Sequence, residues 1–358
     1  MSSLLEIDGA ACAGSGMIVR QAVAYAAVTG TPIHLHHVRA SRPRPGLRRQ
    51  HLGAVEAVRT LVGGTVEGAS PGSREFTFCP GGERPRGQYA FDVGTSGSAT
   101  ALSLALLPVL ATASEQPIRV ELTGGLFQDR APSAFHLQHV LAPLIARMGL
   151  AIAVTLVRPG YVPTGGGLLR LEVRTDGPLV PLEAQQSGSV RSVRSVRSVW
   201  GIALASHLQE RRVSRRMADS ACEVFTRAGY EARIDEREDT SALQPGAGLA
   251  VFADLTGGWR LGADGAGARG RPAESIGRAT AERLLEDVRT GAVLDRFASD
   301  QIITFTALAR GRSRARLPEV TDHVRTGVWL TNLFGVAQAT LHGRLLVVEG
   351  GGTAGGRS

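Results

Sequence analysis

Apolar and polar positions in residues 1–80 follow an order in which strand-like and helix-like segments alternate. Short apolar runs typical of strands are separated by longer segments typical of helices. The predicted strands are residues 4–8, 33–38, 65–67 and 75–79, and the predicted helices end at residues 28 and 62. This order, β-α-β-α-β-β, predicts an α/β unit in which helices cover a small sheet.

The same order returns in residues 89–173. The predicted strands are here residues 89–92, 118–122, 151–157 and 168–173, and the predicted helices end at residues 112 and 148. In both units the first strand ends in an apolar residue followed by an aspartate, Asp8 or Asp92. A turn rich in glycine and serine then leads into the first helix. A repeat at this scale indicates that both segments share one fold.

The C-terminal part predicts a third copy of this order, preceded by residues of a different character. The elements of the third copy are helices at 294–308 and 324–334, joined by a loop, and strands at 337–341 and 345–348. The preceding residues contain a Ser-Val-Arg triplet tract at 189–199, a charged helix at 209–228 and a glycine-rich stretch at 262–270. The triplet tract is interpreted as a strand, with nucleic-acid binding by its arginines as the alternative.

We therefore predict an α/β fold in which three repeated β-α-β-α-β-β units form a large domain. This large domain comprises residues 1–182 and 276–358, and a smaller α/β domain is inserted at residues 183–275. The length of 358 residues and the hydrophobic fraction of 43% suit such a globular chain.

Composition also indicates a compartment. The N-terminal sequence MSSLLEIDGA lacks a basic start followed by a long apolar run, so no signal peptide is expected. No apolar stretch reaches the roughly 20 residues that a membrane-spanning helix needs. Cys12, Cys79 and Cys222 are odd in number and widely spaced, which disfavours a disulfide framework or a zinc site. These features predict a cytoplasmic protein that does not insert into a membrane.

The basic residues narrow the candidate chemistry. All 40 are arginines, because the sequence contains no lysine, and the formal net charge is +8. A P-loop requires a lysine, and a lysyl-adenylate ligase requires a lysine nucleophile, so both classes are excluded. Covalent nucleotide chemistry in this chain would need another nucleophile, for which histidine is the natural candidate.

Residues 37–51 form the most basic segment of the chain. The segment contains five arginines, namely Arg39, Arg42, Arg44, Arg48 and Arg49. No acidic residue occurs between Asp8 and Glu56 to neutralise them. The arginines precede a predicted helix, whose free N–H groups also favour an anion. A phosphate site is therefore predicted, with a solvated basic loop as the alternative.

Several motifs resemble those of the RNA 3′-terminal phosphate cyclase family, and they occur in the same order. Residues 39–51 are similar to the family pattern R-x-x-R-x-x-P-G-L-x-x-Q-H. Residues 160–167, GYVPTGGG, are similar to G-[FY]-x-P-x-G-G-G. The remaining matches are Ile7-Asp8-Gly9 with Gly14, Gly16 and Arg20, the turn 94–98, Thr123-Gly124-Gly125, and Ala131-Pro132. The resemblance covers nearly the whole chain and is weakest in the predicted insert.

The resemblance implies an activity and a set of site residues. His323, in the pattern T-D-H-V-R-T-G-V, matches the catalytic histidine that the family adenylylates with ATP on the way to an RNA 2′,3′-cyclic phosphate. The start of a helix, where His323 is predicted, disfavours a positive imidazolium. The ATP-binding positions would be Phe297, Ala298, Ser299, Asp300, Gln301 and Leu104, and the phosphate-binding or RNA-binding positions would be Arg20, Arg39, Arg42 and Gln50. A divalent cation, Mg²⁺ or Mn²⁺, is expected with the ATP, RNA 3′-phosphate ends are the expected partner, and DNA is not expected.

The sequence departs from the family pattern near the expected nucleotide site. Ala13 and Met17 stand where the family has a glutamate and a glutamine, Leu104 stands where a glutamine is expected, and Phe297 where a histidine or tyrosine is common. No protein ligand for a metal ion is therefore assigned. A non-catalytic relative that binds RNA or an RNA-processing partner is the first alternative. An enolpyruvyl-type transferase built from similar repeats is the second.

Other histidines are interpreted as structural or surface residues. His34, His36 and His37 lie on a predicted strand without a carboxylate or cysteine nearby in the sequence, so no metal role is expected for them. His136 and His139 have helical i,i+3 spacing and are expected at the surface or an edge.

Overall fold

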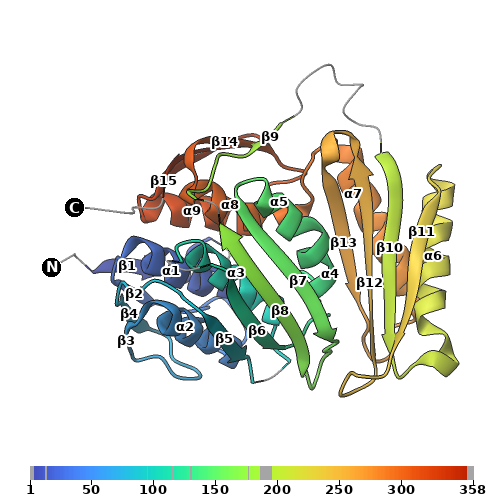
Figure 1. Cartoon of the computed structure of the whole chain (residues 1–358), viewed down its shortest axis with the longest axis horizontal. Coiled ribbons are helices and arrows are strands. Elements are labelled where there is room, and N and C mark those ends of the chain that lie inside the picture. The colour runs from blue at the N-terminus through green and yellow to red at the C-terminus, as the bar shows by residue number, and fades with distance from the viewer. Residues whose placement is uncertain are drawn as a thin grey trace.

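The computed structural model describes residues 4–12, 14–94, 96–113, 116–129, 131–175, 177–185 and 196–352. These residues form four mixed sheets of four strands each, together with the helices that cover them. Figure 1 shows the fourth sheet and its helices (yellow and orange) at one end of the molecule, beside the other three. The α/β class predicted from the sequence is confirmed. Among the described residues, no helix combines the length and apolar character needed to cross a membrane.

The first sheet has the element order that the hydrophobic pattern predicts. Its elements are β1 (Leu5–Asp8), α1 (Gly16–Thr29), β2 (Ile33–His36), α2 (Arg49–Val62), β3 (Gly64–Glu67) and β4 (Phe76–Pro80). Strands β1 and β2 are parallel, because helix α1 carries the chain back between them. The antiparallel pair β4 and β3 completes the sheet in the order β1-β2-β4-β3.

The second sheet repeats this topology. Its elements are β5 (Gln88–Asp92), α3 (Ala99–Leu110), β6 (Ile118–Gly124), α4 (Ala134–His136), a π-helical segment (Leu137–Leu141), α5 (Ala142–Ala146), β7 (Leu150–Arg158) and β8 (Gly167–Thr175). Strands β5 and β6 are parallel, and the sheet order is β5-β6-β8-β7. The helix predicted over residues 133–148 therefore forms with a π-helical middle.

The third sheet shows the same order again, with two strands, β9 and β14, that the sequence analysis missed. Its elements are β9 (Glu183–Ala184), α8 (Arg296–Leu308), β14 (Arg310–Arg316), α9 (Asp322–Leu333), β15 (Ala337–His342) and β16 (Leu345–Gly351). The sheet order is β9-β14-β16-β15, with β9 and β14 parallel.

We expected a loop after residue 308, and this expectation is wrong because strand β14 forms there. Its sequence, RGRSRAR, contains no large apolar residue, so the hydrophobic pattern gives no strand signal. The strand alternates in a different way. Ser313 and Ala315 are buried, whereas Arg312 and Arg316 are exposed.

The fourth sheet interrupts the third unit between β9 and α8. Its elements are β10 (Val196–Ser206), a 3-10 turn (Gln209–Arg211), α6 (Val213–Arg227), β11 (Ala232–Asp239), β12 (Gly246–Leu255), a second 3-10 turn (Thr256–Gly258), β13 (Arg260–Ala266) and α7 (Ala273–Thr290). Only the last residues of the Ser-Val-Arg tract, 196–199, are described, and they belong to β10.

The pairing of β9 and the packing of α7 bear on the bounds of the inserted unit. Strand β9 pairs with β14 of the third sheet, and Gly277 of α7 lies against Met217 and Ala221 of α6. We therefore propose that the inserted unit runs from residue 196 to residue 290, in place of the 183–275 expected from composition.

The sheet of the inserted unit separates two hydrophobic cores. Successive side chains of a strand point to opposite faces. Accordingly, Ile202 and Leu204 of β10 belong to the large core shared with the second unit, whereas Ala203 and Ala205 pack with α6 and α7. Both faces of this sheet are thus buried, which explains why β10 and β12 read as nearly continuous apolar runs.

The junction between the units contains a buried charge network around Asp295. Asp295 caps helix α8 by accepting the N–H groups of Phe297 (2.9 Å) and Ala298 (2.8 Å). Its other oxygen lies 3.0 Å from Nε2 of His136 in α4 and accepts the Gly262 N–H of β13 at 2.9 Å. The surface location expected for His136 is wrong, since its side chain is fully buried.

His139, expected at the surface together with His136, also packs inward. It is half-buried, and its ring packs edge-on against Trp200 and Phe252 of the inserted unit. Both histidines thus face elements that lie far away in the sequence. The i,i+3 spacing alone could not reveal these partners.

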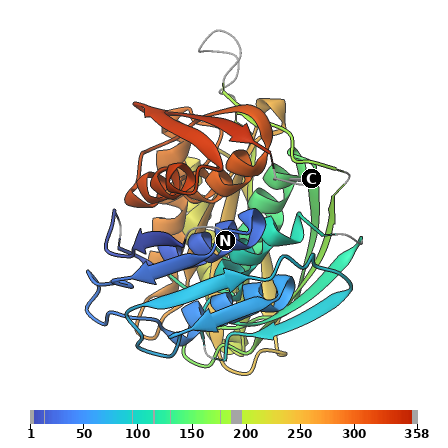
Figure 2. The same ribbon diagram turned by 90° about the vertical axis from the view of Figure 1, so that its left-hand side faces the viewer.

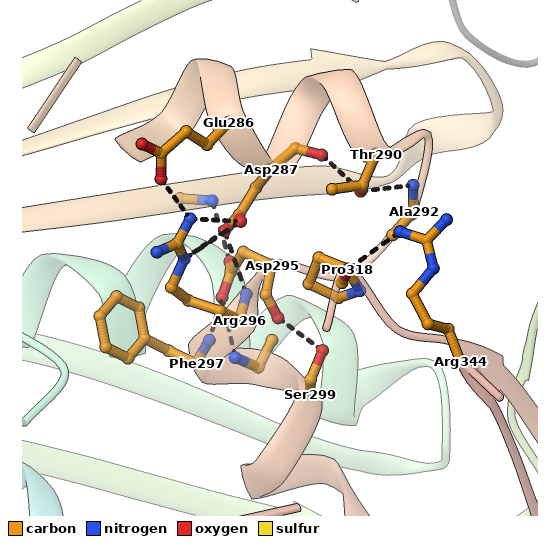
Figure 3. A network of polar contacts seen from close by, with 12 residues as sticks. Glu286, Asp287, Thr290, Ala292, Asp295, Arg296, Phe297, Ser299, Pro318 and Arg344 are labelled. Atoms are coloured by element: carbon orange, nitrogen blue, oxygen red, sulfur yellow. Dashed lines mark hydrogen bonds and ion pairs between the residues drawn. The ribbon is translucent and has the colours of Figure 1, made fainter. Parts of the chain in front are cut away.

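A second ion-pair network joins α7 to the start of α8 (Figure 3). The buried carboxylate of Asp287 accepts the backbone N–H of Arg296 (3.1 Å) and its guanidinium (2.9 Å). The same guanidinium donates to the exposed Glu286 at 2.8 Å. Arg296 thus neutralises a buried charge at the point where the inserted unit returns to the third unit.

The Arg296→Met variant is expected to lower the free energy of unfolding by about 3 kcal/mol, because it leaves the buried Asp287 carboxylate without its cation. The measurement is urea unfolding at neutral pH. The matched control is Arg312→Met, which removes an exposed arginine that pairs with Glu349 at 2.9 Å and should change stability by less than about 1 kcal/mol. Equal effects of the two variants would contradict the importance of the buried pair.

Candidate active site

Helices α1, α8 and α9 bring the first and third units into contact. The Tyr25 and Thr331 hydroxyls lie 2.8 Å apart and join α1 to α9. Gln21 of α1 donates to Thr304 of α8 at 3.2 Å. Figures 1 and 2 both show the third unit (red) lying against the first unit (blue). These contacts hold α1 against α8 and α9.

His323 lies in the first turn of α9. Thr321 caps this helix by accepting the Val324 N–H at 3.2 Å, which fixes the backbone around the histidine. Nδ1 of His323 lies 3.3 Å from Oδ2 of Asp300, and its side chain is 44% exposed. A carboxylate partner favours the proton on Nδ1, which leaves the lone pair on Nε2. This arrangement suits a nucleophile.

Asp300 is the group that orients His323. It is nearly fully buried in α8, and Gln301 donates a short hydrogen bond to its other oxygen. Burial raises the pKa of Asp300, and the hydrogen bond from His323 opposes that shift. Burial also lowers the pKa of the Arg20 guanidinium to about 10, an effect that the nearby charge of Asp300 opposes. Arg20 thus remains a cation at neutral pH.

A narrow cavity lies between α1, α3 and α8. Three residues predicted from the sequence as site residues line it together, namely Arg20, Leu104 and Gln301. Met17 also lines it, and this side chain is almost fully buried. Ala13 and Thr95, which the motif comparison also singled out, lie outside the described residues.

Three further residues of the predicted ATP-binding segment face away from this cavity into the protein. Ala298 and Ser299 are fully buried, and the Ser299 hydroxyl donates to the Asp295 carbonyl oxygen. The Phe297 ring packs edge-on against His136, with the ring centroids 5.8 Å apart. In the arrangement described, Asp300 and Gln301 are the members of this segment nearest to His323 and the cavity.

The arginine-rich loop lines a separate groove beside the second unit. The side chains that line this groove include Arg39, Arg48, Arg49 and Gln50 from the first unit and Ser96 and Gln128 from the second. Its cations repel one another and have no acidic partner within the segment. Burial and the neighbouring charges of Arg48 and Arg42 accordingly lower the pKa of Arg39.

Arg39 also shapes the loop. Its guanidinium donates to the carbonyl oxygens of Arg44 (2.8 Å) and Gly46 (2.9 Å). The half-buried Arg42 lies on the same loop, and its N–H donates to the Arg39 carbonyl oxygen at 3.0 Å. One guanidinium therefore holds the loop in shape, while its neighbours supply the remaining positive charge of the groove.

His51, in the first turn of α2, packs against the first turn of α1, a contact that sequence reasoning missed. The side chain is buried, and its Nδ1 accepts the Arg48 N–H at 3.1 Å. Its Nε2 packs against Gly16, where a Cβ atom would lie only 2.1 Å away. Burial, with the charges of Arg20, Arg39 and Arg48, lowers the pKa of His51 to about 3. The position of His51 three residues after Arg48, the N-cap of α2, is the sequence signal for this contact.

The fold and the site together define a repeated α/β protein in which a histidine paired with an aspartate lies near a cavity lined by a buried arginine. A profile of the RNA 3′-terminal phosphate cyclase family matches residues 11–341. The chain therefore belongs to this family, and the resemblance seen in its motifs is confirmed.

Relatives named RNA 3′-terminal phosphate cyclase are similar over nearly their full length. The chain is 36% identical to the protein of Caldivirga maquilingensis over 335 residues, which is 92% of each chain. It is 36% identical to that of Pyrococcus furiosus over 348 residues, which is 97% of this chain and 96% of the relative. It is 39% identical to that of Hyperthermus butylicus over 333 residues, which is 91% and 90% of the two chains.

The stability of wild type is expected to fall as the pH drops below about 6.5, partly because His51 stays neutral in the fold. The folded pKa, about 3, lies below the unfolded value, so the unfolded chain takes up the proton first. His51 should therefore account for about 2 kcal/mol of lost stability between pH 7.5 and pH 5.0. The measurement is the free energy of unfolding in urea at both pH values, for wild type and for His51→Gln. The difference between the two pH dependences gives the contribution of His51, because other groups titrate equally in both proteins. Identical pH dependence in the two proteins would contradict a buried neutral His51.

Proposed function

We propose that this protein is an RNA 3′-terminal phosphate cyclase that uses ATP to convert an RNA 3′-phosphate into a 2′,3′-cyclic phosphate. The observation that carries the proposal is the contact between Nδ1 of His323 and Asp300 beside the cavity lined by Arg20 and Gln301. Family membership supports this reaction as the one that the site performs.

In the first step, Nε2 of His323 would attack the α-phosphorus of ATP, and the bond to pyrophosphate would break. The attack places a positive charge on the imidazole, which the Asp300 carboxylate stabilises through Nδ1–H. Arg20 would stabilise the negative charge that develops on the phosphate oxygens. The product is AMP linked to His323, and Gln301 would contact the nucleotide.

In the later steps, an oxygen of the RNA 3′-phosphate would displace His323 from the AMP phosphorus. The neighbouring 2′-hydroxyl would then attack the RNA phosphorus, close the cyclic phosphate and release AMP. The groove lined by Arg39 and Gln50, with Arg42 on the same loop, is suited to hold the phosphates of the RNA end. RNA is favoured over DNA as the partner because the ring closure requires a 2′-hydroxyl.

The described residues around the cavity do not fit a cation held by the protein. Met17 and Leu104 are apolar, and Asp300 already interacts with His323 and Gln301. A Mg²⁺ or Mn²⁺ ion would therefore have to enter together with the triphosphate.

A cytoplasmic location stays a prediction. The three free cysteines suit it.

A non-catalytic RNA-binding relative remains the second candidate. The observation that favours it is the pair of apolar side chains, Met17 and Leu104, that line the cavity next to Arg20. Such a protein would keep the arginine groove and its affinity for RNA ends. It would not form an adduct with the nucleotide.

The His323→Ala variant is expected to abolish a covalent, acid-labile adduct formed from ATP labelled on the α-phosphate, because His323 is the nucleophile in the proposed reaction. The adduct is measured on denaturing gels with Mg²⁺ or Mn²⁺ present. The control is His342→Ala, which removes an exposed histidine of β15 and should leave the adduct at the wild-type level. If wild type forms no adduct with either cation, the catalytic proposal fails and the RNA-binding alternative gains support.

The Leu104→Gln variant should bind ATP more tightly, with a KM for ATP about fivefold lower, because one added hydrogen bond contributes about 1 kcal/mol. The readout is the rate of adduct formation as a function of ATP concentration. The control is Leu243→Gln on the exposed part of the inserted unit, which should leave KM unchanged. An unchanged KM in Leu104→Gln would argue against contact between the nucleotide and Leu104.

A further inference from the structure

Three potential metal ligands meet at the carboxyl ends of β1 and β2, apart from the groups assigned to catalysis. Asp8 and His36 are register partners on these parallel strands, and His37 follows directly. Nδ1 of His37 lies 3.1 Å from Oδ1 of Asp8 and 3.1 Å from Nδ1 of His36. One ligand atom from each residue lies within 4.8 Å of the other two. The sequence analysis missed the carboxylate because parallel pairing, rather than proximity in sequence, brings it there.

An unusual backbone conformation places the two histidines together. Consecutive residues of a strand normally point to opposite faces. His37 instead has a φ of 50°, in the left-handed region that non-glycine residues rarely adopt. The chain turns there, and the His36 and His37 rings meet edge to face with centroids 4.6 Å apart. Residues held in this region often mark a functional contact.

The three ligand atoms of the cluster cannot all form good hydrogen bonds with one another. An imidazole Nδ1 has a single in-plane position, which holds either one proton or one lone pair. His37 Nδ1 faces both Asp8 and His36 Nδ1, so one proton there would have to be shared between two acceptors. A cation between the three atoms would accept all three lone pairs at once.

The geometry suits a first-row transition metal. Ligand atoms about 2.1 Å from an ion in tetrahedral or octahedral arrangement lie about 3.0–3.4 Å apart, close to the two separations seen here. Two imidazoles and one carboxylate are the donors that Zn²⁺, Co²⁺ and Ni²⁺ prefer over Mg²⁺ or Ca²⁺. Oδ1 of Asp8 also accepts the Ala10 N–H at 2.9 Å, which orients the carboxylate.

We propose that Asp8, His36 and His37 form a binding site for a divalent transition-metal ion such as Zn²⁺. The site joins the two loops that lead into α1 and α2. Gly9, in the first loop, packs so closely on the second that a Cβ atom would lie 2.8 Å from the His36 carbonyl oxygen. The Asp8 and His37 side chains are both about half exposed or more, so the remaining coordination positions are open to water or to an anionic ligand. Binding would tie the loop that precedes Arg20 to the loop that carries Arg39.

The test is equilibrium dialysis of the full chain against Zn²⁺ and, separately, Co²⁺. Wild type is expected to bind one ion, and His37→Gln and Asp8→Asn should weaken binding by at least about tenfold. The matched control is His34→Gln, on the same strand, because His34 pairs with Glu6 at 2.8 Å outside the cluster. Circular dichroism of each variant checks that it is folded, and the wild-type melting temperature should rise with the metal.

Three results would overturn the proposal. The first is the absence of a bound ion in wild type, and the second is an equal loss of binding in His34→Gln and His37→Gln. The third is a sulfur charge-transfer band in the Co²⁺ complex that disappears in Cys12→Ser, since it would assign the ion to a thiolate. None of these readouts depends on ATP, so the failure of the metal site can be distinguished from the failure of the proposed catalytic activity.

Discussion

The architecture depends on one buried charge, that of Asp295. This carboxylate joins three segments that are distant in sequence, because it caps α8 and binds His136 of α4 and the Gly262 N–H of β13. Burial alone would lower the pKa of His136, but the charge and hydrogen bond of Asp295 raise it, which favours an ion pair between the two side chains. A buried carboxylate without such partners would cost several kcal/mol. The pair therefore specifies how the second unit, the inserted unit and the third unit meet.

The site inherits its geometry from this junction. Asp300 lies a little over one turn after Asp295 on the same helix, so the capping contact also sets the position of the group that orients His323. The contacts of Gln21 and Tyr25 then fix α1, and with it Arg20, against α8 and α9. Side chains that do not themselves react therefore hold the three site residues in place. These residues are His323 on α9, Asp300 on α8 and Arg20 on α1.

Periodicity in the sequence predicted most strands and helices of the three similar sheets, because buried residues such as Ile33 and Leu35 of β2 alternate with more exposed polar ones. It missed β14, whose alternation involves arginine, serine and alanine without large apolar residues. The motifs nominated Arg20, Leu104 and Gln301, yet only packing shows that these residues from three helices line one cavity. The burial of His51 and His136 and the approach of Asp8 to His37 also depend on contacts between distant segments. Local patterns carry no information about such contacts.

The double-sided sheet of the inserted unit has a consequence for how this chain could be shortened. Gly246 and Gly248 of β12 lie flat against the rings of Tyr161 and Phe127, where no side chain would fit. Removing residues 196–290 would uncover these rings and leave Asp295 without its partner on β13. The inserted unit therefore contributes side chains to the large hydrophobic core and is not an appended module. A minimal catalytic fragment lacking it would expose an apolar face and be prone to aggregation.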